Sequence, residues 1–67
     1  MSVVKVIEIM SDSTKSWEDA AKVGIEKASR TLKNIRSAWV KEQSLTVGEN
    51  GKVTSYRVTL KLTFELE

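Results

Sequence analysis

The 67-residue sequence contains neither cysteine nor histidine. Without cysteine it forms no disulfide and no thiolate metal site, and without histidine the usual zinc, iron and copper sites and histidine-based catalytic triads are excluded. We expect one domain spanning residues 1–67, which buries only about 60% of the surface that its unfolded chain exposes. Domains below about 70 to 80 residues usually need an additional stabilising element, and self-association is the one that remains here.

An excess of one charge is also lacking. Eleven basic and nine acidic residues are interspersed and leave a net charge of +2, which is too balanced to predict nucleic-acid binding. We find no charged segment followed by an apolar one at the start, and no apolar run that approaches the ~20 residues of a membrane-spanning helix. We therefore expect a cytoplasmic protein that binds neither nucleic acid nor membrane.

The most regular pattern in the sequence lies at residues 54–66. Apolar and polar residues alternate there with period two, which predicts a β-strand with one apolar face. The face that is mainly apolar consists of Thr54, Tyr56, Val58, Leu60, Leu62, Phe64 and Leu66. At ~3.3 Å per residue this strand would be roughly 43 Å long. The rest of so small a chain cannot cover that length, so either one end frays or another copy of the protein covers it.

An earlier strand is predicted at Val3 to Met10, where both alternating sets of residues are largely apolar. A strand with two apolar faces is buried on both sides. The chain offers one helix and hence one covering layer, so the second layer points to a partner chain. The polar residues Ser11 to Lys15 that follow predict a turn.

A helix is predicted to begin after Ser16 and to run to about Lys33 or Asn34. Ser16 is suited to cap the helix, and Asp19 three residues later would complete a capping box. Gly24 costs about 1 kcal/mol relative to alanine inside a helix, and we expect a close approach to the sheet as the compensation. The predicted inner stripe, with Trp17 as a core or interface anchor, comprises Trp17, Ala20, Ala21, Gly24, Ile25, Ala28, Thr31 or Leu32, and Ile35.

The second strand is predicted from Ile35 to about Val47, and Asn-Gly within residues 48–51 predicts a hairpin to the third strand. A right-handed crossover makes the first two strands parallel, and the hairpin makes the last two antiparallel. If the third strand lies between the others, all neighbours are antiparallel. We therefore predict an α+β fold of β-α-β-β topology, in which a three-stranded antiparallel sheet of order 1-3-2 wraps on one helix.

Five segments in this order resemble the dodecin family: VIEI in the first strand, SWEDA at the start of the helix, the spacing from Ala28 to Ile35, KEQ at positions 41–43, and YRVTLKLTFEL at the end. The resemblance covers nearly the whole chain. It implies a hollow homododecamer that binds and stores a small ligand without catalysis. In this family the ligand is often a flavin (riboflavin, FMN or FAD), and in some members coenzyme A.

Two positions depart from the flavin-binding members. The resemblance places their flavin-stacking tryptophan at Ser37, which has no π-face, and their flavin-contacting glutamine at Arg57. Trp39 shares a strand face with Ser37; it either stacks a ligand from a shifted place or packs at a subunit contact. Arg57 either pairs with a carboxylate of another chain or meets a ligand phosphate. With Gln43, these three residues are the predicted ligand-binding residues, and flavin binding is expected to be weakened.

The segment Ser37-Ala38-Trp39-Val40 resembles a second branch of the family, described as calcium dodecins. Calcium needs clustered oxygen ligands, and one chain offers no EF-hand pattern. Symmetry copies of one carboxylate could instead form a ring, with Glu42 as the first candidate metal ligand and Glu8, Glu65 and Asp12 as reserves. The alternative function is thus a dodecin that binds calcium or another cation and no flavin. No residue pattern indicates an enzyme.

Overall fold

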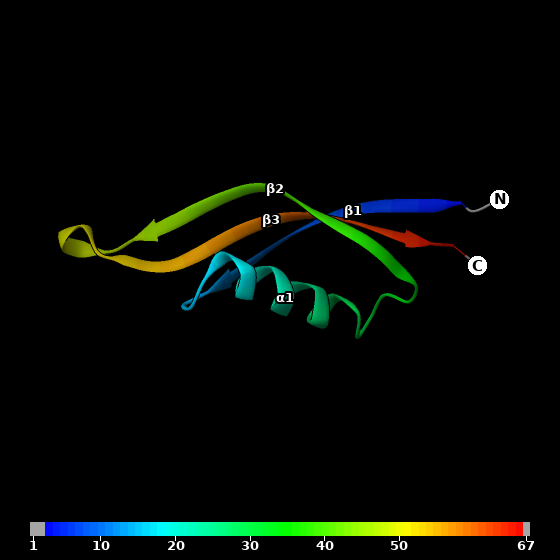
Figure 1. Ribbon diagram of the computed structural model, residues 1–67, viewed down its shortest axis with the longest axis horizontal. Helices are drawn as coiled ribbons and strands as arrows, with labels where there is room; N and C mark the ends of the chain where they lie inside the picture. The colour runs from blue at the N-terminus through cyan, green and yellow to red at the C-terminus, as the bar shows by residue number, and fades with distance from the viewer. Residues whose placement is uncertain (1–2, 67) are drawn as a thin grey trace.

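The computed structural model describes residues 3–66 and has the predicted element order (Figure 1). Its elements are β1 (Val4–Ser13), α1 (Trp17–Ala28), β2 (Ile35–Val47), the single 3-10 turn η1 (Glu49–Gly51) and β3 (Val53–Glu65). β3 lies between the other two strands and pairs with both in antiparallel orientation, so that the sheet has the order β1-β3-β2. The predicted α+β fold and its strand order are confirmed.

The core lies between α1 and the face of the sheet that the helix covers. Val58, Leu60 and Leu62 of β3 are fully buried there, together with Ala20 of α1. Partly buried side chains surround them: Ile7, Ile9, Trp17, Ala21, Ile25, Ala28, Ile35 and Ala38. The alternating apolar residues of β3 and the small residues of the helix therefore meet as their spacing predicts.

Gly24 lies where α1 packs tightly against β1. A Cβ atom on Gly24 would lie 2.9 Å from Ser11 Cβ and 3.4 Å from Leu60 Cδ1. The first distance is shorter than two carbon atoms tolerate, so any side chain here would push helix and strand apart. The close approach that was expected to compensate for a glycine inside the helix is confirmed.

The helix begins as predicted but ends earlier. Ser16 Oγ accepts a hydrogen bond of 2.9 Å from the Asp19 backbone N–H, which confirms the N-cap. The Asp19 carboxylate does not complete a capping box; it accepts from Ser13 Oγ at 2.6 Å. The predicted end at Lys33 or Asn34 is wrong, because α1 stops at Ala28.

Tight turns replace the expected last part of the helix. The Arg30 and Thr31 backbone N–H groups each bond a carbonyl three residues back, and Ser29 Oγ donates to the Glu26 carbonyl. Such bonds satisfy the last carbonyls of a helix while narrowing its turn. Asn34 then takes a positive φ of 64°, which redirects the chain into β2.

The polar residues at 11–13 continue β1, so the predicted turn at Ser11 to Lys15 is wrong for its first three residues. Ser11 lies opposite Val58, and Ser13 lies opposite Tyr56. The long central strand β3 supplies a hydrogen-bonding partner along this segment, and that pairing overrides the turn preference of the polar residues.

Much of the sheet extends beyond the helix (Figure 1). The molecule measures 52 × 19 × 14 Å, and residues 53–55 of β3 pair with β2 alone. Asn50 and Gly51 both have positive φ in the connecting turn, as the Asn-Gly signal predicts. Large apolar side chains remain exposed on the parts of the sheet that the helix does not cover. They include Val4, Val6, Met10, Trp39, Leu45, Val47 and Val53. Among residues 3–66, no helix is long and apolar enough to cross a membrane.

Candidate functional site

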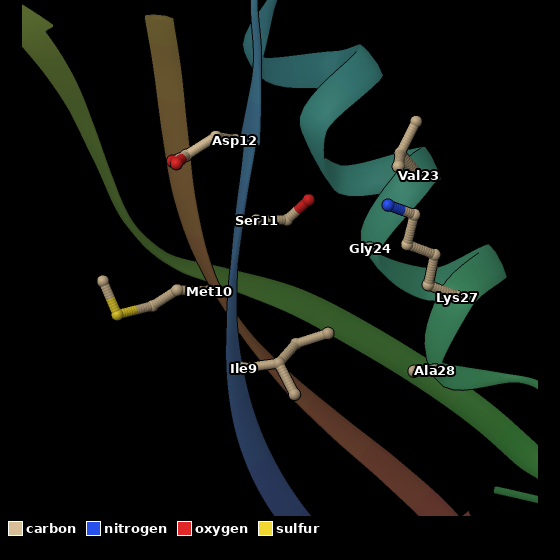
Figure 2. A pocket seen from close by; sticks show the side chains of 8 residues that line it. All are labelled: Ile9, Met10, Ser11, Asp12, Val23, Gly24, Lys27 and Ala28. Atoms are coloured by element: carbon tan, nitrogen blue, oxygen red, sulfur yellow. The ribbon is translucent and has the colours of Figure 1, made fainter. Parts of the chain in front are cut away.

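The predicted site residues lie mainly on the sheet face opposite α1, which we call the outer face. Directly opposed residues of paired strands share a face, so the strand registers define its members. They are Val4, Val6, Glu8, Met10 and Asp12 of β1, Arg57, Thr59, Lys61, Thr63 and Glu65 of β3, and Ser37, Trp39, Glu42 and Ser44 of β2. Figure 2 shows this alternation on β1, where Met10 and Asp12 point away from α1 while Ile9 and Ser11 point toward it.

Three ion pairs link the strands across this face. They join Lys41 Nζ to Glu8 Oε1 at 2.8 Å, Arg57 Nε to Asp12 Oδ1 at 2.7 Å, and Arg36 Nε to Glu65 Oε1 at 2.8 Å. Arg57 makes a second bond of 3.2 Å from Nη2 to Asp12 Oδ2, so that pair is bidentate. Lys41 reaches from β2 over the central strand to β1.

Two of these pairs, Lys41–Glu8 and Arg57–Asp12, favour the ionised form of their carboxylates. The hydrogen bond from Lys41, together with its charge, lowers the pKa of Glu8, and Glu8 in turn raises the pKa of Lys41. The hydrogen bond from Arg57 likewise lowers the pKa of Asp12. Each of these carboxylates is therefore ionised at neutral pH and already has a cationic partner in its own chain.

Glu42 differs from the other three predicted metal ligands. It is exposed and lies opposite Thr59, and its side chain makes no ion pair or hydrogen bond within residues 3–66. Its charge contributes only the last of the effects that raise the pKa of the neighbouring Lys41. No group of three acidic side chains in this part of the chain is arranged to hold a metal ion. Within residues 3–66, Glu42 is therefore the candidate carboxylate without an ion pair or hydrogen bond, and the neighbouring cation, Lys41, is bonded to Glu8.

Ser37 and Trp39 lie side by side on the outer face, as the sequence predicts. Ser37 Oγ shares a hydrogen bond with Thr63 Oγ1 of β3. Trp39 is 48% exposed, and the ammonium group of Lys61 lies 5.8 Å from the centre of its ring. Trp39 is thus an accessible aromatic surface, with a cation beside it.

A bulge in β2 separates Gln43 from this pair. The register shifts between Val40 and Glu42, after which Glu42 lies opposite Thr59 and Gln43 opposite Val58. Strict alternation would place Gln43 on the face of Ser37 and Trp39, but the extra residue reverses the parity. Gln43 therefore belongs to the helix side of the sheet, and the same bulge brings Glu42 onto the outer face.

Two further predicted residues are engaged within the chain. Arg57 pairs with Asp12 of its own chain, a partner that differs from both predicted alternatives, a carboxylate of another chain and a ligand phosphate. Trp17 packs against the core, donates from Nε1 to the Ser44 carbonyl at 3.0 Å, and meets the ring of Tyr56 edge-on at a centroid distance of 5.3 Å. Its position matches the interpretation of Trp17 as a core anchor.

A groove of about 400 Å³ runs between β1 and α1 (Figure 2). Apolar side chains of Ile9, Val23 and Ala28 line it, with the Lys27 side chain along one wall. Of the predicted site residues it includes only Asp12. The groove therefore shares Met10 and Asp12 of β1 with the outer face, whereas the predicted ligand-binding residues Ser37, Trp39 and Arg57 lie on the outer face away from it.

Comparison with known proteins gives a consistent result. A model of the dodecin family matches residues 3–67. Calcium dodecin from Mycobacterium tuberculosis is 42% identical over 66 residues, which cover 98% of this chain and 92% of that protein.

Solved structures agree with this match. Dodecin from Streptomyces davaonensis superposes with a TM-score of 0.92 at 29% identity, covering 98% of this chain and 96% of that one. A variant of Thermus thermophilus dodecin gives a TM-score of 0.91 at 34% identity, covering 100% and 98%. The calcium dodecin of M. tuberculosis, described as calcium-chelating with a novel calcium-binding site, gives 0.86 at 39% identity, covering 98% and 93%.

Proposed function

The chain belongs to the dodecin family, and from that premise we propose that it is a non-catalytic binding and storage protein that assembles as a homododecamer and binds calcium or a similar cation rather than a flavin. One observation carries the choice of ligand. Of four candidate carboxylates on the outer face, three have an arginine or lysine partner in their own chain, and Glu42 makes no ion pair or hydrogen bond within residues 3–66. The 42% identity to a calcium dodecin supports the same choice.

The small core of the single chain and its exposed apolar surface support assembly. The core contains four fully buried apolar residues, which is little for an independent domain. Val4, Val6 and Met10 of β1 are 51%, 48% and 62% exposed on the outer face, and Val47 and Val53 are exposed at the hairpin. Burying this apolar surface against other copies would supply the stabilisation that the small core lacks.

Assembly also allows a cation site to form, although residues 3–66 of one chain contain no group of three acidic side chains that could hold a metal ion. Calcium takes six to eight oxygen ligands in flexible geometry, and one Glu42 carboxylate supplies at most two of them. Copies of Glu42 gathered around a symmetry axis would multiply that number, and their charges would repel one another unless neutralised. A bound divalent cation provides both the neutralisation and the attraction between subunits.

The same face is poorly suited to a flavin. Ser37 has no ring to stack on, its hydroxyl is bonded to Thr63, and Arg57 is occupied by Asp12. Loss of one stacking contact costs ~1 to 3 kcal/mol, or about one order of magnitude or more in affinity. Weak binding of a planar ligand at Trp39 is the second candidate function, because 48% of this side chain is exposed.

The cation proposal is tested by thermal unfolding of the assembled protein in millimolar calcium and in a chelator. A ligand that binds only the folded assembly stabilises it by mass action. We expect calcium to raise the melting temperature and the chelator to lower it, and Glu42→Gln to reduce the difference. Glu49→Gln, an exposed acid on η1, is the matched control and should retain the full difference. Superimposable curves with calcium and with chelator would sink the cation proposal.

A further inference from the structure

Glu8, Lys61 and Trp39 form one lateral row across the outer face. Lys61 of the central strand lies directly opposite Glu8 on one side and directly opposite Trp39 on the other. Opposed side chains on one face are about 5 Å apart at their Cβ atoms, so Lys61 has two neighbours of different chemistry within reach. One is a carboxylate and the other an aromatic ring.

A second lysine, Lys41, determines which of these two neighbours Lys61 contacts. Lys41 extends across the sheet and bonds Glu8 at 2.8 Å. Lys61 makes no ion pair or hydrogen bond with Glu8 and only adds its charge to the lowering of the Glu8 pKa, while its ammonium group lies 5.8 Å from the centre of the Trp39 ring. That distance is within the range of a cation–π contact. A lysine next to a free carboxylate would favour the ion pair, so the Lys41–Glu8 pair leaves Lys61 available to Trp39.

We propose that Lys61 is a specificity-determining residue that covers the Trp39 ring and so hinders the binding of planar ligands. This proposal rests on the part of the proposed function that excludes flavins. A planar molecule stacks at about 3.5 Å from an aromatic ring and needs the space in front of it. It must displace the ammonium group and forfeit the cation–π contact. Lys41 acts as a positioning residue in this arrangement, because it occupies the carboxylate that would otherwise draw Lys61 away.

The test is a titration of the assembled protein with riboflavin, a neutral planar probe, followed by quenching of flavin fluorescence. Lys61→Gln removes the covering cation and should strengthen binding about two- to fivefold, the equivalent of one exposed cation–π contact. Lys61→Arg keeps a cation over the ring and should give no gain. Each variant is first checked for assembly by light scattering.

Two variants that leave Lys61 intact test the role of Lys41. Lys41→Gln frees Glu8 to pair with Lys61, which should uncover Trp39 and strengthen riboflavin binding. Glu8→Gln removes the competing carboxylate, so Lys61 should stay on the ring and binding should match the wild type. Every gain should disappear when Trp39→Ala is added.

The inference is overturned if Lys61→Gln binds riboflavin no better than the wild type, if Lys41→Gln shows no gain, or if a gain persists with Trp39→Ala. The calcium dependence of the melting temperature is a separate readout. Failure of the covering role therefore leaves that dependence unchanged, and failure of cation binding leaves the riboflavin series unchanged.

Discussion

The two faces of the sheet differ in what covers them. The face under α1 is completed by the chain itself, since Val58, Leu60 and Leu62 are fully buried and Gly24 lies against Ser11. No helix or strand of residues 3–66 covers the outer face. It carries three exposed ion pairs, exposed apolar residues on β1 and a half-exposed tryptophan.

This difference separates the residues that specify the fold from those that serve binding. Close packing between helix and sheet depends on side-chain volume and fixes the strand order and register. Exposed ion pairs contribute little to stability, so the charges of the outer face can change without loss of the fold. We infer that the helix side determines the architecture, and that the outer face is where assembly and ligand choice are determined.

The largest expected effect is on the helix side. Leu60→Ala removes a fully buried side chain and should lower the free energy of unfolding by about 2–5 kcal/mol, because it leaves a cavity. Thr59→Ala changes the adjacent residue on the outer face and should stay within about 0.5–1 kcal/mol. Chemical denaturation at one fixed protein concentration measures both. Equal losses for the two variants would remove the distinction between the faces.

A smaller effect is expected at Gly24, where the helix packs tightly against the sheet. Gly24→Ala gains about 1 kcal/mol of helix propensity, but its Cβ would lie 2.9 Å from Ser11 Cβ, and overpacking costs typically about 1–3 kcal/mol. We expect a net loss of up to about 2 kcal/mol in the unfolding free energy. Lys22→Ala, at an exposed position of the same helix, is the control. Stabilisation by Gly24→Ala would mean that the contact relaxes without strain.

The smallest effect is expected from an outer-face ion pair, and it depends on pH. Arg57 lowers the pKa of Asp12 in the folded protein. The ionised pair therefore stabilises the fold above the ordinary aspartate pKa of about 4, and this contribution is lost as the pH falls through the lowered pKa.

Asp12→Asn should accordingly reduce the melting temperature slightly at pH 7 and make its decline below about pH 4 less steep. Salt at 1 M should shrink the difference from the wild type, since it screens charges beyond about 3 Å. Thermal unfolding over a pH series measures this. An identical acid slope in the two proteins would show that the pair contributes nothing.

Most of the fold could be predicted because its signals are local and repeated. The alternation from Val58 to Leu62 predicts the central strand, Ser16 predicts the start of the helix, and Asn50-Gly51 predicts the hairpin. Each signal agrees with the others about one topology, which is the condition for a sequence to specify a structure. The family resemblance rests on the same segments and agrees with them.

The early end of α1 at Ala28 reflects local turns, whereas two other features depend on pairing between distant segments. Ser11 and Ser13 lie in β1 because β3 pairs with them, and nothing in their own sequence shows this. The bulge between Val40 and Glu42 decides that Gln43 faces the helix side and Glu42 the outer face, although a reading of alternate residues cannot locate it.

The site was predicted less completely than the fold. Glu8, Asp12 and Glu65 were identified as acidic residues of interest, but their partners are far away in sequence and only the folded sheet brings them together. The contacts of Lys61 with Trp39 and of Lys41 with Glu8 depend on the strand registers, which the sequence pattern does not give. The roles of Ser37, Trp39, Gln43 and Arg57 in binding stay predictions.

The most direct test of this account is the mass of the purified protein by light scattering after gel filtration. An outer face that other copies complete requires assembly, and the account predicts close to twelve times the chain mass of 7.5 kDa. Val6→Lys would place a charge among the exposed apolar residues of β1 and should reduce that mass, whereas Lys22→Ala should not. A folded monomer of the wild-type protein at micromolar concentration would contradict the account.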